Sequence, residues 1–236
     1  MPRIGEIDLC AAPCAAIAIQ EAVAPEAIRA AAGEHRVLVE LRLDALGEHD
    51  PLALAAFAAR YAGFPRLVTL RHADEGGGWR GGEAARVACY EAVLAHCEAV
   101  DVEICAGEAI RAVAPAARSA GRLVIGSFHD FGETPDDDRL ASIYALGRER
   151  GADVVKVAAR CNTLDDLRRL AAFTLAHRAE GVIVVGMGAY GLPSRVFFPA
   201  LGSLVTYTFL GAPTAPGQLN CGDTLKYLDA FDPRLA

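Results

Sequence analysis

The sequence is poor in lysine and lacks the signals that mark several large classes of protein. Only two of its 23 basic residues are lysines, Lys156 and Lys226. A formal charge of −7 disfavours general binding to nucleic acid or to anionic membranes, because both need a basic surface. No apolar run approaches the roughly 20 residues of a membrane span. Arg3 is soon followed by Glu6, so we expect neither a signal peptide nor a membrane segment.

Cysteine patterns typical of zinc sites and of disulfide frameworks are also missing. The seven cysteines are odd in number and scattered, and no two of them have C-x-x-C spacing. Such cysteines are typical of small buried residues in a reducing compartment. The sequence therefore predicts a cytoplasmic protein with no zinc-type metal site.

Short apolar runs alternate with alanine-rich amphipathic stretches along the 236 residues, which is typical of βα units and a parallel sheet. The expected strands are 6–11, 36–44, 66–71, 99–105, 122–128, 152–158, 181–187 and 204–210. The expected helices lie near 16–32, 50–62, 81–97, 107–119, 136–149, 163–179, 191–200 and 221–230. This pattern predicts an α/β fold, a single (β/α)8 TIM barrel over residues 1–236. A doubly wound open sheet is the alternative, although no dinucleotide-binding fingerprint follows the first expected strand.

Lys156 stands in the middle of one of these apolar strands. Valines flank it on both sides and Gly151 precedes the run, as in a buried parallel strand. Burial disfavours the ammonium ion and lowers the pKa of a lysine, so that its amine can attack a ketone or aldehyde and form a Schiff base. Most lysines near strands instead extend to solvent or pair with a carboxylate. The surroundings of Lys156 must decide between the two interpretations.

Polar residues recur near the C-terminal ends of successive expected strands, where a (β/α)8 barrel carries its active site. Residues two apart on a strand share a face, so several of these side chains should meet inside the barrel. Each pair alone would be an ordinary ion pair or core contact, but their repetition predicts one functional site. The residues are Glu40 and Arg42, Arg71 and Glu75, Asp101 and Glu103, Ser127 and His129, and Lys156.

Two glycine-rich segments follow the last two expected strands. In GMGAYGLPSR, residues 186–195, backbone N–H groups and Arg195 could face an anion. In GAPTAPGQL, residues 211–219, the composition suits a hinged loop that closes over the barrel mouth. A plain surface loop is the alternative for both.

Six motifs in order give the chain a family resemblance between about Val37 and Leu219. They are E-x-R-x-D at 40–44, T-x-R followed by E-G-G at 69–77, S-x-H-D-F with T-P at 127–135, V-K-V around Lys156, M-G-x-x-G-x-x-S-R at 187–195, and A-P-G-Q at 215–218. In these motifs the chain resembles the type I 3-dehydroquinate dehydratases. Members of that family are (β/α)8 barrels, which agrees with the alternation of expected strands and helices.

The resemblance implies dehydration of 3-dehydroquinate to 3-dehydroshikimate, the third step of the shikimate pathway, through an imine on the enzyme. By similarity, Lys156 would attack the C3 ketone and His129 would transfer the protons. Glu75 and Asp101 match positions that orient His129 and stabilise its charged form. Arg195 matches the arginine that pairs with the substrate carboxylate.

The remaining matched positions would contact the substrate ring. Glu40, Arg42 and Arg71 correspond to residues that bind its hydroxyl groups, and Gln218 to a contact from the closing loop. Thr214 stands where the family has serine and keeps the hydroxyl. The resemblance implies no cofactor and no metal. It also implies a homodimer as the assembly to test, because the family is often dimeric.

Two other functions remain open at this point. Another Schiff-base barrel, an aldolase of the transaldolase or keto-acid type, would share the strand lysine but would not need His129, Glu40 and Gln218 together. A regulator that binds quinate-like metabolites without catalysis would not need Lys156 or His129, and both are present.

Overall fold

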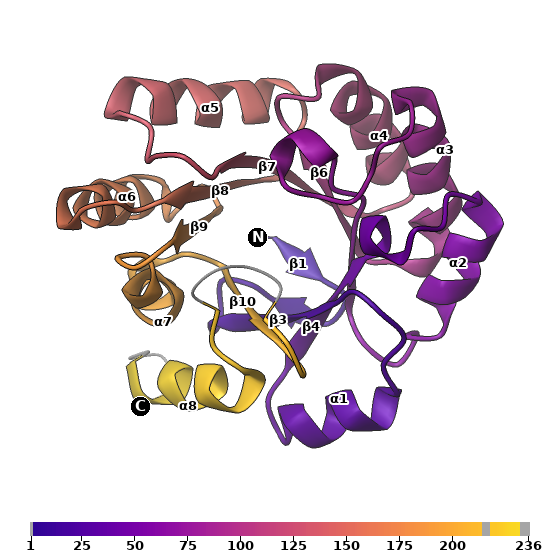
Figure 1. Ribbon diagram of the computed structural model, residues 1–236, viewed down its shortest axis with the longest axis horizontal. Coiled ribbons are helices and arrows are strands. Elements are labelled where there is room, and N and C mark those ends of the chain that lie inside the picture. The colour runs from indigo at the N-terminus through magenta and orange to yellow at the C-terminus, as the bar shows by residue number, and fades with distance from the viewer. Residues whose placement is uncertain (1, 214–217, 232–236) are drawn as a thin grey trace.

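The computed structural model describes residues 2–213 and 218–231. In this part of the chain, parallel strands form a ring and α-helices lie outside it (Figure 1). The strands of the ring are β3 (Cys14–Ile19), β4 (Val37–Arg42), β5 (Arg66–Thr69), β6 (Ala99–Glu103), β7 (Leu123–Asp130), β8 (Val154–Arg160), β9 (Val182–Met187) and β10 (Val205–Phe209). The helices are α1 (Pro25–Ala32), α2 (Pro51–Ala59), α3 (Glu83–Val93), α4 (Gly107–Ser119), α5 (Asp137–Glu149), α6 (Leu164–His177), α7 (Leu192–Leu201) and α8 (Cys221–Phe231). The predicted single (β/α)8 barrel is confirmed.

The ring closes between β9 and β10 through a short junction instead of a full ladder. The backbone N–H of Leu204 donates to the carbonyl of Val182 at 2.9 Å. The Ser203 hydroxyl accepts from the N–H of Val184, also at 2.9 Å. This closure excludes the open, doubly wound sheet.

The N-terminal end of the barrel is covered by a small hairpin of β1 (Arg3–Ile4) and β2 (Ile7–Asp8). Figure 1 shows β1 inside the outline of the ring. Ile4, Ile7 and Leu9 are buried in the cluster that fills the lower part of the barrel interior. The hairpin therefore excludes water from the end of the barrel opposite the strand C-termini.

The expected first strand at 6–11 and the expected helix over 16–32 are wrong. The first barrel strand is β3, and the following helix is only α1. The β3 sequence CAAIAI contains three alanines, which are strong helix formers. Between β10 and β4 it is buried on both faces, so tertiary contacts override local propensity. The other expected elements are present, with ends that differ by a few residues.

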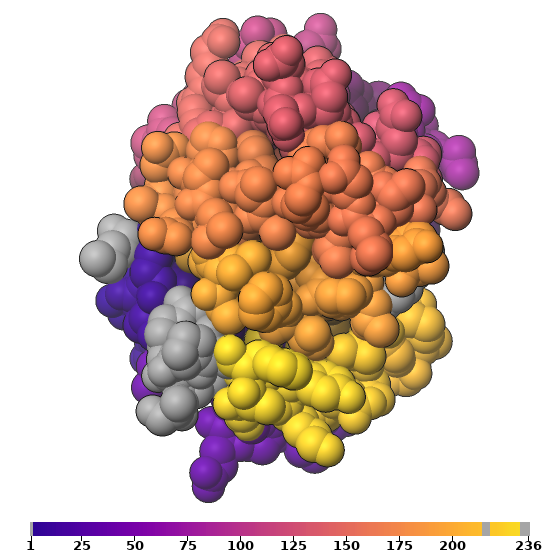
Figure 2. Space-filling view, turned by 90° about the vertical axis from the view of Figure 1, so that its left-hand side faces the viewer, coloured from indigo at the N-terminus to yellow at the C-terminus, as the bar shows by residue number. Residues whose placement is uncertain are grey.

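Helix starts follow from local chemistry. Asp50 and Asp136 accept backbone N–H bonds at the starts of α2 and α5, as capping residues do. Thr163 and Asp166 form a capping box at the start of α6. In Figure 2 the segment from α6 to α8 forms a continuous outer face, in orange to yellow. In the described part of the chain, no helix has the length and apolar content needed to cross a membrane.

The barrel interior changes from apolar to charged along the strands. Near the strand N-termini the inward side chains are apolar, namely Leu38, Leu67, Ala99, Ile125, Val154 and Ile183. Two residues further along the strands come Glu40, Thr69, Asp101, Ser127 and Lys156, and beyond them Arg42, Arg71, Glu103 and His129. Because side chains alternate along a strand, both polar layers face inward. The functional groups therefore gather at the C-terminal end of the barrel.

Candidate active site

A cavity opens at the C-terminal ends of the strands, where the sequence placed the site. Most of the predicted site residues that the structure describes line it, whereas Asp101, Glu103 and Ser127 lie buried behind its wall. The predicted residues on its wall are Glu40, Arg42, Arg71, Glu75, His129, Lys156, Arg195 and Gln218. Thr214 lies outside the described residues. The fold thus brings together side chains that are up to 178 positions apart in the chain (218 − 40).

Lys156 projects into this cavity from the middle of β8 and is 5% exposed. Its Nζ donates to Asp101 Oδ2 at 2.9 Å and lies over the ring of Tyr207, 4.1 Å from the ring centre. The lysine is buried as predicted, but its surroundings are not purely apolar as the flanking valines suggested. A carboxylate and an aromatic face adjoin the amine, which must be without its proton to act as a nucleophile.

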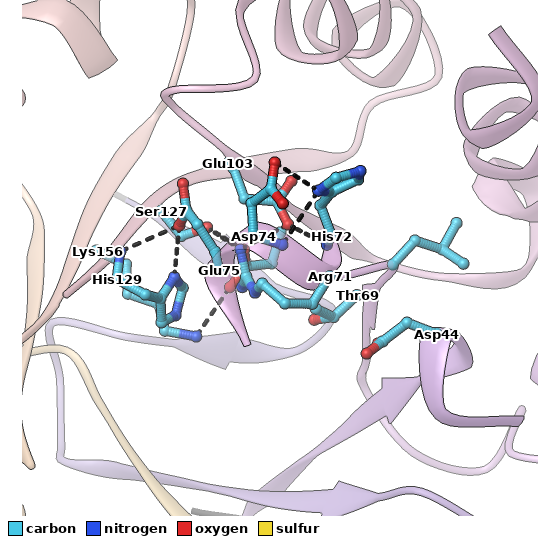
Figure 3. Close-up of polar contacts among 12 residues, drawn as sticks. Asp44, Thr69, Arg71, His72, Asp74, Glu75, Glu103, Ser127, His129 and Lys156 are labelled. Atoms are coloured by element: carbon cyan, nitrogen blue, oxygen red, sulfur yellow. Dashed lines mark hydrogen bonds and ion pairs between the residues drawn. The ribbon is translucent and has the colours of Figure 1, made fainter. Parts of the chain in front are cut away.

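Asp101 is the centre of a buried polar network, and Figure 3 labels its three partners, Lys156, Arg71 and Ser127. Besides the bond from Lys156, its Oδ1 accepts from Arg71 at 2.7 Å and from the Ser127 hydroxyl at 2.5 Å. Burial raises the pKa of this carboxyl, but the charges of Arg71 and Lys156 outweigh burial and hold the pKa well below its ordinary value. Asp101 therefore stays ionised and fixes the position of the lysine amine.

His129 ends the same polar face two residues after Ser127 and pairs with Glu75. Glu75 Oε2 lies 2.9 Å from His129 Nδ1 and accepts the backbone N–H of His129 at 3.0 Å. The two bonds fix both the ring and the main chain of His129 against the turn that carries Glu75. The hydrogen bonds of Asp101 go to Lys156, Arg71 and Ser127, so Asp101 acts on His129 through its charge.

The electrostatics of the His129–Glu75 pair favour uncharged forms. Burial, followed by the positive charges of Arg71 and Lys156, lowers the pKa of His129 well below 6.5. Burial also raises the pKa of Glu75 to about 8, against the opposing charge of Arg71. When Glu75 is protonated, its hydroxyl donates to Nδ1 and the ring proton of His129 lies on Nε2. When Glu75 is ionised, it accepts from Nδ1–H, and Nε2 is then free to act as a base. The state of Glu75 therefore decides whether Nε2 donates or accepts a proton.

Arg42 and Glu40 are held rigidly at the end of β4. Arg42 donates to both carboxylate oxygens of Asp44, at 3.0 and 2.8 Å. Asp44 also accepts the backbone N–H of Gly78 at 3.0 Å, and Glu40 accepts from the Thr69 hydroxyl at 2.9 Å. Bidentate contacts of this kind fix the plane of a guanidinium. Asp44 was part of the E-x-R-x-D motif, but the sequence alone assigned it no role.

Arg195 lies in the first turn of α7, is 3% exposed and forms part of the cavity wall. Its backbone carbonyl accepts from the Thr206 hydroxyl at 2.7 Å, which ties the helix to β10. Burial lowers the pKa of Arg195 to about 10, so the guanidinium keeps its charge near neutral pH. A buried guanidinium facing a cavity is well suited to bind a carboxylate.

A second buried ion network lies behind Arg71, and the sequence did not predict it as a network. Glu103 pairs with Arg71 at 3.2 Å, accepts the backbone N–H of His72 at 2.8 Å and accepts from Arg86 at 2.5 Å. Arg86, on α3, is 0% exposed and also donates to the carbonyl of Leu70 at 3.1 Å. The network fixes the chain just before Glu75. The face shared by Asp101 and Glu103 was the only signal of it in the sequence.

The loop that carries Glu75 packs too closely for side chains on its glycines. A Cβ on Gly77 would lie 2.0 Å from the carbonyl oxygen of Arg71, and one on Gly78 would lie 2.3 Å from that of Asp44. Such contacts are shorter than non-bonded atoms allow. The run EGGGW is therefore explained by backbone packing, and its only charged member, Glu75, is directed at His129.

Groups that could hold a metal ion are a separate matter. Across residues 2–213 and 218–231, no group of three or more His, Cys, Asp or Glu side chains is arranged to hold one.

Comparisons with known proteins agree with this geometry. A profile of the type I 3-dehydroquinase family matches residues 14–232. A 3-dehydroquinate dehydratase of Methanococcoides burtonii is 31% identical over 237 residues, which cover 98% of this chain and 100% of that protein. One from Thermodesulfovibrio yellowstonii is 35% identical over 191 residues, 79% of this chain and 81% of that protein.

A solved structure provides a comparison of the fold. The crystal structure of 3-dehydroquinate dehydratase from Geobacillus kaustophilus superposes with a TM-score of 0.81 at 26% identity, and the match covers 93% of this chain and 90% of that one. The barrel, the cavity and the profile match over nearly the whole chain lead to the same assignment. This chain belongs to the type I 3-dehydroquinase family.

Proposed function

We propose that the protein converts 3-dehydroquinate to 3-dehydroshikimate and water through a Schiff base on Lys156. This is the third step of the shikimate pathway, which leads to chorismate and the aromatic amino acids. The observation that carries the proposal is the meeting of Lys156 and His129 in one cavity, from adjacent strands in which Ser127 pairs with Lys156 and His129 with Ala158. Family membership points to the same hydro-lyase activity, and His129, Glu40 and Gln218 on one cavity wall go beyond what an aldolase or a non-catalytic binding protein would need.

Lys156 is the nucleophile in this mechanism. Its amine adds to the C3 ketone, and loss of water from the adduct leaves a protonated imine. The imine withdraws electrons from C2 and makes the C2 proton acidic. Asp101 is unsuited to remove the lysine proton, because the charges of Arg71 and Lys156 outweigh burial and hold its pKa well below the ordinary value. We assign that proton transfer to His129, the neutral base in the same cavity, which then returns the proton to the adduct hydroxyl as it leaves as water.

His129 then removes the C2 proton, and the resulting enamine expels the C1 hydroxyl. The hydroxyl leaves as water after it takes a proton from His129, and water hydrolyses the product imine to regenerate the amine. A single group can serve in both directions because the proton shared with Glu75 moves from Nδ1 to the carboxylate when Nε2 takes a proton, and returns to Nδ1 when Nε2 gives it up. Proton transfer of this kind contributes about 10²- to 10⁴-fold to a rate.

The other cavity residues bind and orient the substrate. Arg195 pairs with the substrate carboxylate, and Glu40 and Arg42 take ring hydroxyls. Arg71 was predicted to do the same, but its guanidinium already serves Ser127, Asp101 and Glu103. We therefore propose that Arg71 acts mainly as the positive charge that keeps this acidic network ionised.

The direct test is an assay without metal or cofactor. Purified protein mixed with 3-dehydroquinate should produce the conjugated enone, which is followed by its ultraviolet absorbance. Absence of the enone, with the protein folded and the substrate intact, would refute the proposed activity.

The pH dependence should report the pair of His129 and Glu75. Because the folded pKa of Glu75 is raised to about 8, Glu75 stays protonated below that pH and Nε2 carries a proton. As pH rises, Glu75 ionises and the form of His129 with an unprotonated Nε2 becomes populated. We therefore expect kcat/KM to increase with a midpoint near 8. Glu75→Gln should lose this step and lower kcat by about 100-fold.

Steady-state kinetics at pH values on both sides of that midpoint measures this dependence. Glu149→Gln, at the exposed end of α5, is the matched control and should keep the wild-type profile. The assignment fails if Glu75→Gln retains the same step.

Three further expectations stay predictions. We propose a closing role for 211–219 from composition alone, since residues 214–217 lie outside the described chain and Thr214 is among them. Gln218 lines the cavity, as a contact from that loop would. A cytoplasmic location and a homodimer are likewise proposed on the cysteine pattern and on family resemblance.

A further inference from the structure

Phe131 is a large apolar side chain at the mouth of the cavity, and it is 45% exposed. It follows β7 directly, two residues after His129. Its ring is nearly parallel to that of His129, at 17°, with 6.5 Å between the ring centres. A Cβ on Gly76 would lie 2.5 Å from the Phe131 ring. The ring therefore lies against the residue that follows Glu75 and beside the residue that Glu75 binds.

The loop that carries Phe131 is held in place by polar anchors. Asp130 accepts the backbone N–H groups of Gly132 at 2.9 Å and Glu133 at 3.0 Å. The Asn162 side chain donates to the carbonyl of Gly132 at 2.9 Å. Two residues after Gly132, Thr134 donates its hydroxyl proton to the carbonyl of Arg160 at 2.8 Å. These bonds tie the loop to the end of β8, so the position of the ring is defined although half of its surface faces solvent.

The pair next to the ring is largely shielded from water. The side chains of His129 and Glu75 are 10% and 12% exposed. Burial is the largest cause of both the lowered pKa of His129 and the raised pKa of Glu75. An apolar ring at the open end of a polar pair can maintain that burial, because it displaces water without offering a hydrogen bond.

We propose that Phe131 is a positioning residue that keeps water away from the His129–Glu75 pair and holds the turn that carries Glu75. The inference rests on the proposed function, in which His129 transfers the protons. In this proposal the Phe131 ring acts through the His129–Glu75 pair and does not contact the reacting atoms.

Charged groups on the neighbouring strands also act on the pair. They are Arg42 on β4, Arg71 after β5, Asp101 and Glu103 on β6, and Lys156 on β8. None of them is removed when Phe131 is replaced. A change in the titration of His129 in such a variant therefore reports the loss of the apolar cover.

The test is an NMR titration of the histidines in the substrate-free protein. The protein has six histidines, and comparison with a His129→Gln spectrum identifies the resonance of His129. In Phe131→Ala, the pKa of His129 should rise by about one unit toward its ordinary value, because water can solvate the imidazolium. Phe131→Leu keeps an apolar cover and should titrate like the wild type. Phe197→Ala, at a phenylalanine of similar exposure (49%) on α7, is the control for loss of an exposed ring.

Kinetics give the second readout. Phe131→Ala should lower kcat several-fold and shift the pH midpoint of kcat/KM below that of the wild type, while KM stays nearly unchanged. Phe131→Leu should have the kcat and the pH midpoint of the wild type. An unchanged His129 titration in Phe131→Ala would overturn the proposal. A rise in KM alone would also overturn it, because the ring would then only line the substrate site. The titration needs no substrate, so its failure is distinguishable from failure of the proposed activity, which the wild-type assay tests.

Discussion

Lys156→Ala should abolish turnover of 3-dehydroquinate, with a loss in kcat of at least about 10⁴-fold. Without the amine no imine forms, and the C2 proton then lacks the electron sink that makes it acidic. Lys156→Arg should be equally inactive. It keeps a positive charge beside Asp101, but a guanidinium does not deprotonate in proteins and cannot act as the nucleophile.

The scarcity of lysine makes the covalent step easy to locate. Borohydride added with 3-dehydroquinate should reduce the imine and leave the substrate on Lys156, as detected by peptide mass. Lys226 is the only other lysine and lies on the outer helix α8, so Lys226→Ala should retain full activity and full labelling. Label on Lys226, or active enzyme that cannot be labelled, would contradict the mechanism.

Circular dichroism separates loss of the nucleophile from loss of the fold. Lys156→Ala removes one partner of a buried ion pair, which can destabilise a protein. Arg71 and Ser127 still bind Asp101 in that variant, so we expect a folded barrel. The arginine variant retains a cation there and provides the second check on folding.

His129→Ala should give a different defect from that of the lysine variant. The amine remains, so imine formation should persist, although more slowly. Removal of the C2 proton and departure of the C1 hydroxyl both lack their proton carrier, and kcat should fall by about 10²- to 10⁴-fold.

The distinguishing measurement is the amount of trapped intermediate. In His129→Ala, borohydride should still label Lys156 while product forms very slowly, and mass spectrometry should detect substrate imine before reduction. His96→Ala, in the short helix η3 (Leu94–His96) at the far end of the strands, is a control that should keep wild-type kinetics. Near-normal turnover in His129→Ala would assign proton transfer to another group.

Local patterns were sufficient for most of the barrel. Short valine-rich runs such as β8 and β9 are buried on both faces, so their strands could be identified without tertiary information. Helix starts also have local causes, as the capping box of Thr163 and Asp166 shows for α6. The exception was β3, where alanine suits a helix by propensity and a crowded barrel wall by size.

The members of the site were predictable because period two puts Glu40 with Arg42, and Ser127 with His129, on one inner face. Family motifs then selected Glu75 and Arg195, which lie outside the strands. Residues that act through neighbours were harder to find. Phe131 and Asp44 both lie within recognised motifs, yet their contacts with Gly76 and Gly78 depend on a loop from elsewhere in the chain.

The sequence by itself determined seven of the eight barrel strands, the inward-facing polar residues and the buried lysine, because alternation and composition are local properties of the chain. Only the tertiary structure decided the charge state of the site. It placed Asp101 against Lys156, raised the pKa of Glu75 to about 8 and kept His129 neutral. Burial and Coulomb interactions depend on distances between residues far apart in the chain, and those distances exist only after the barrel has closed.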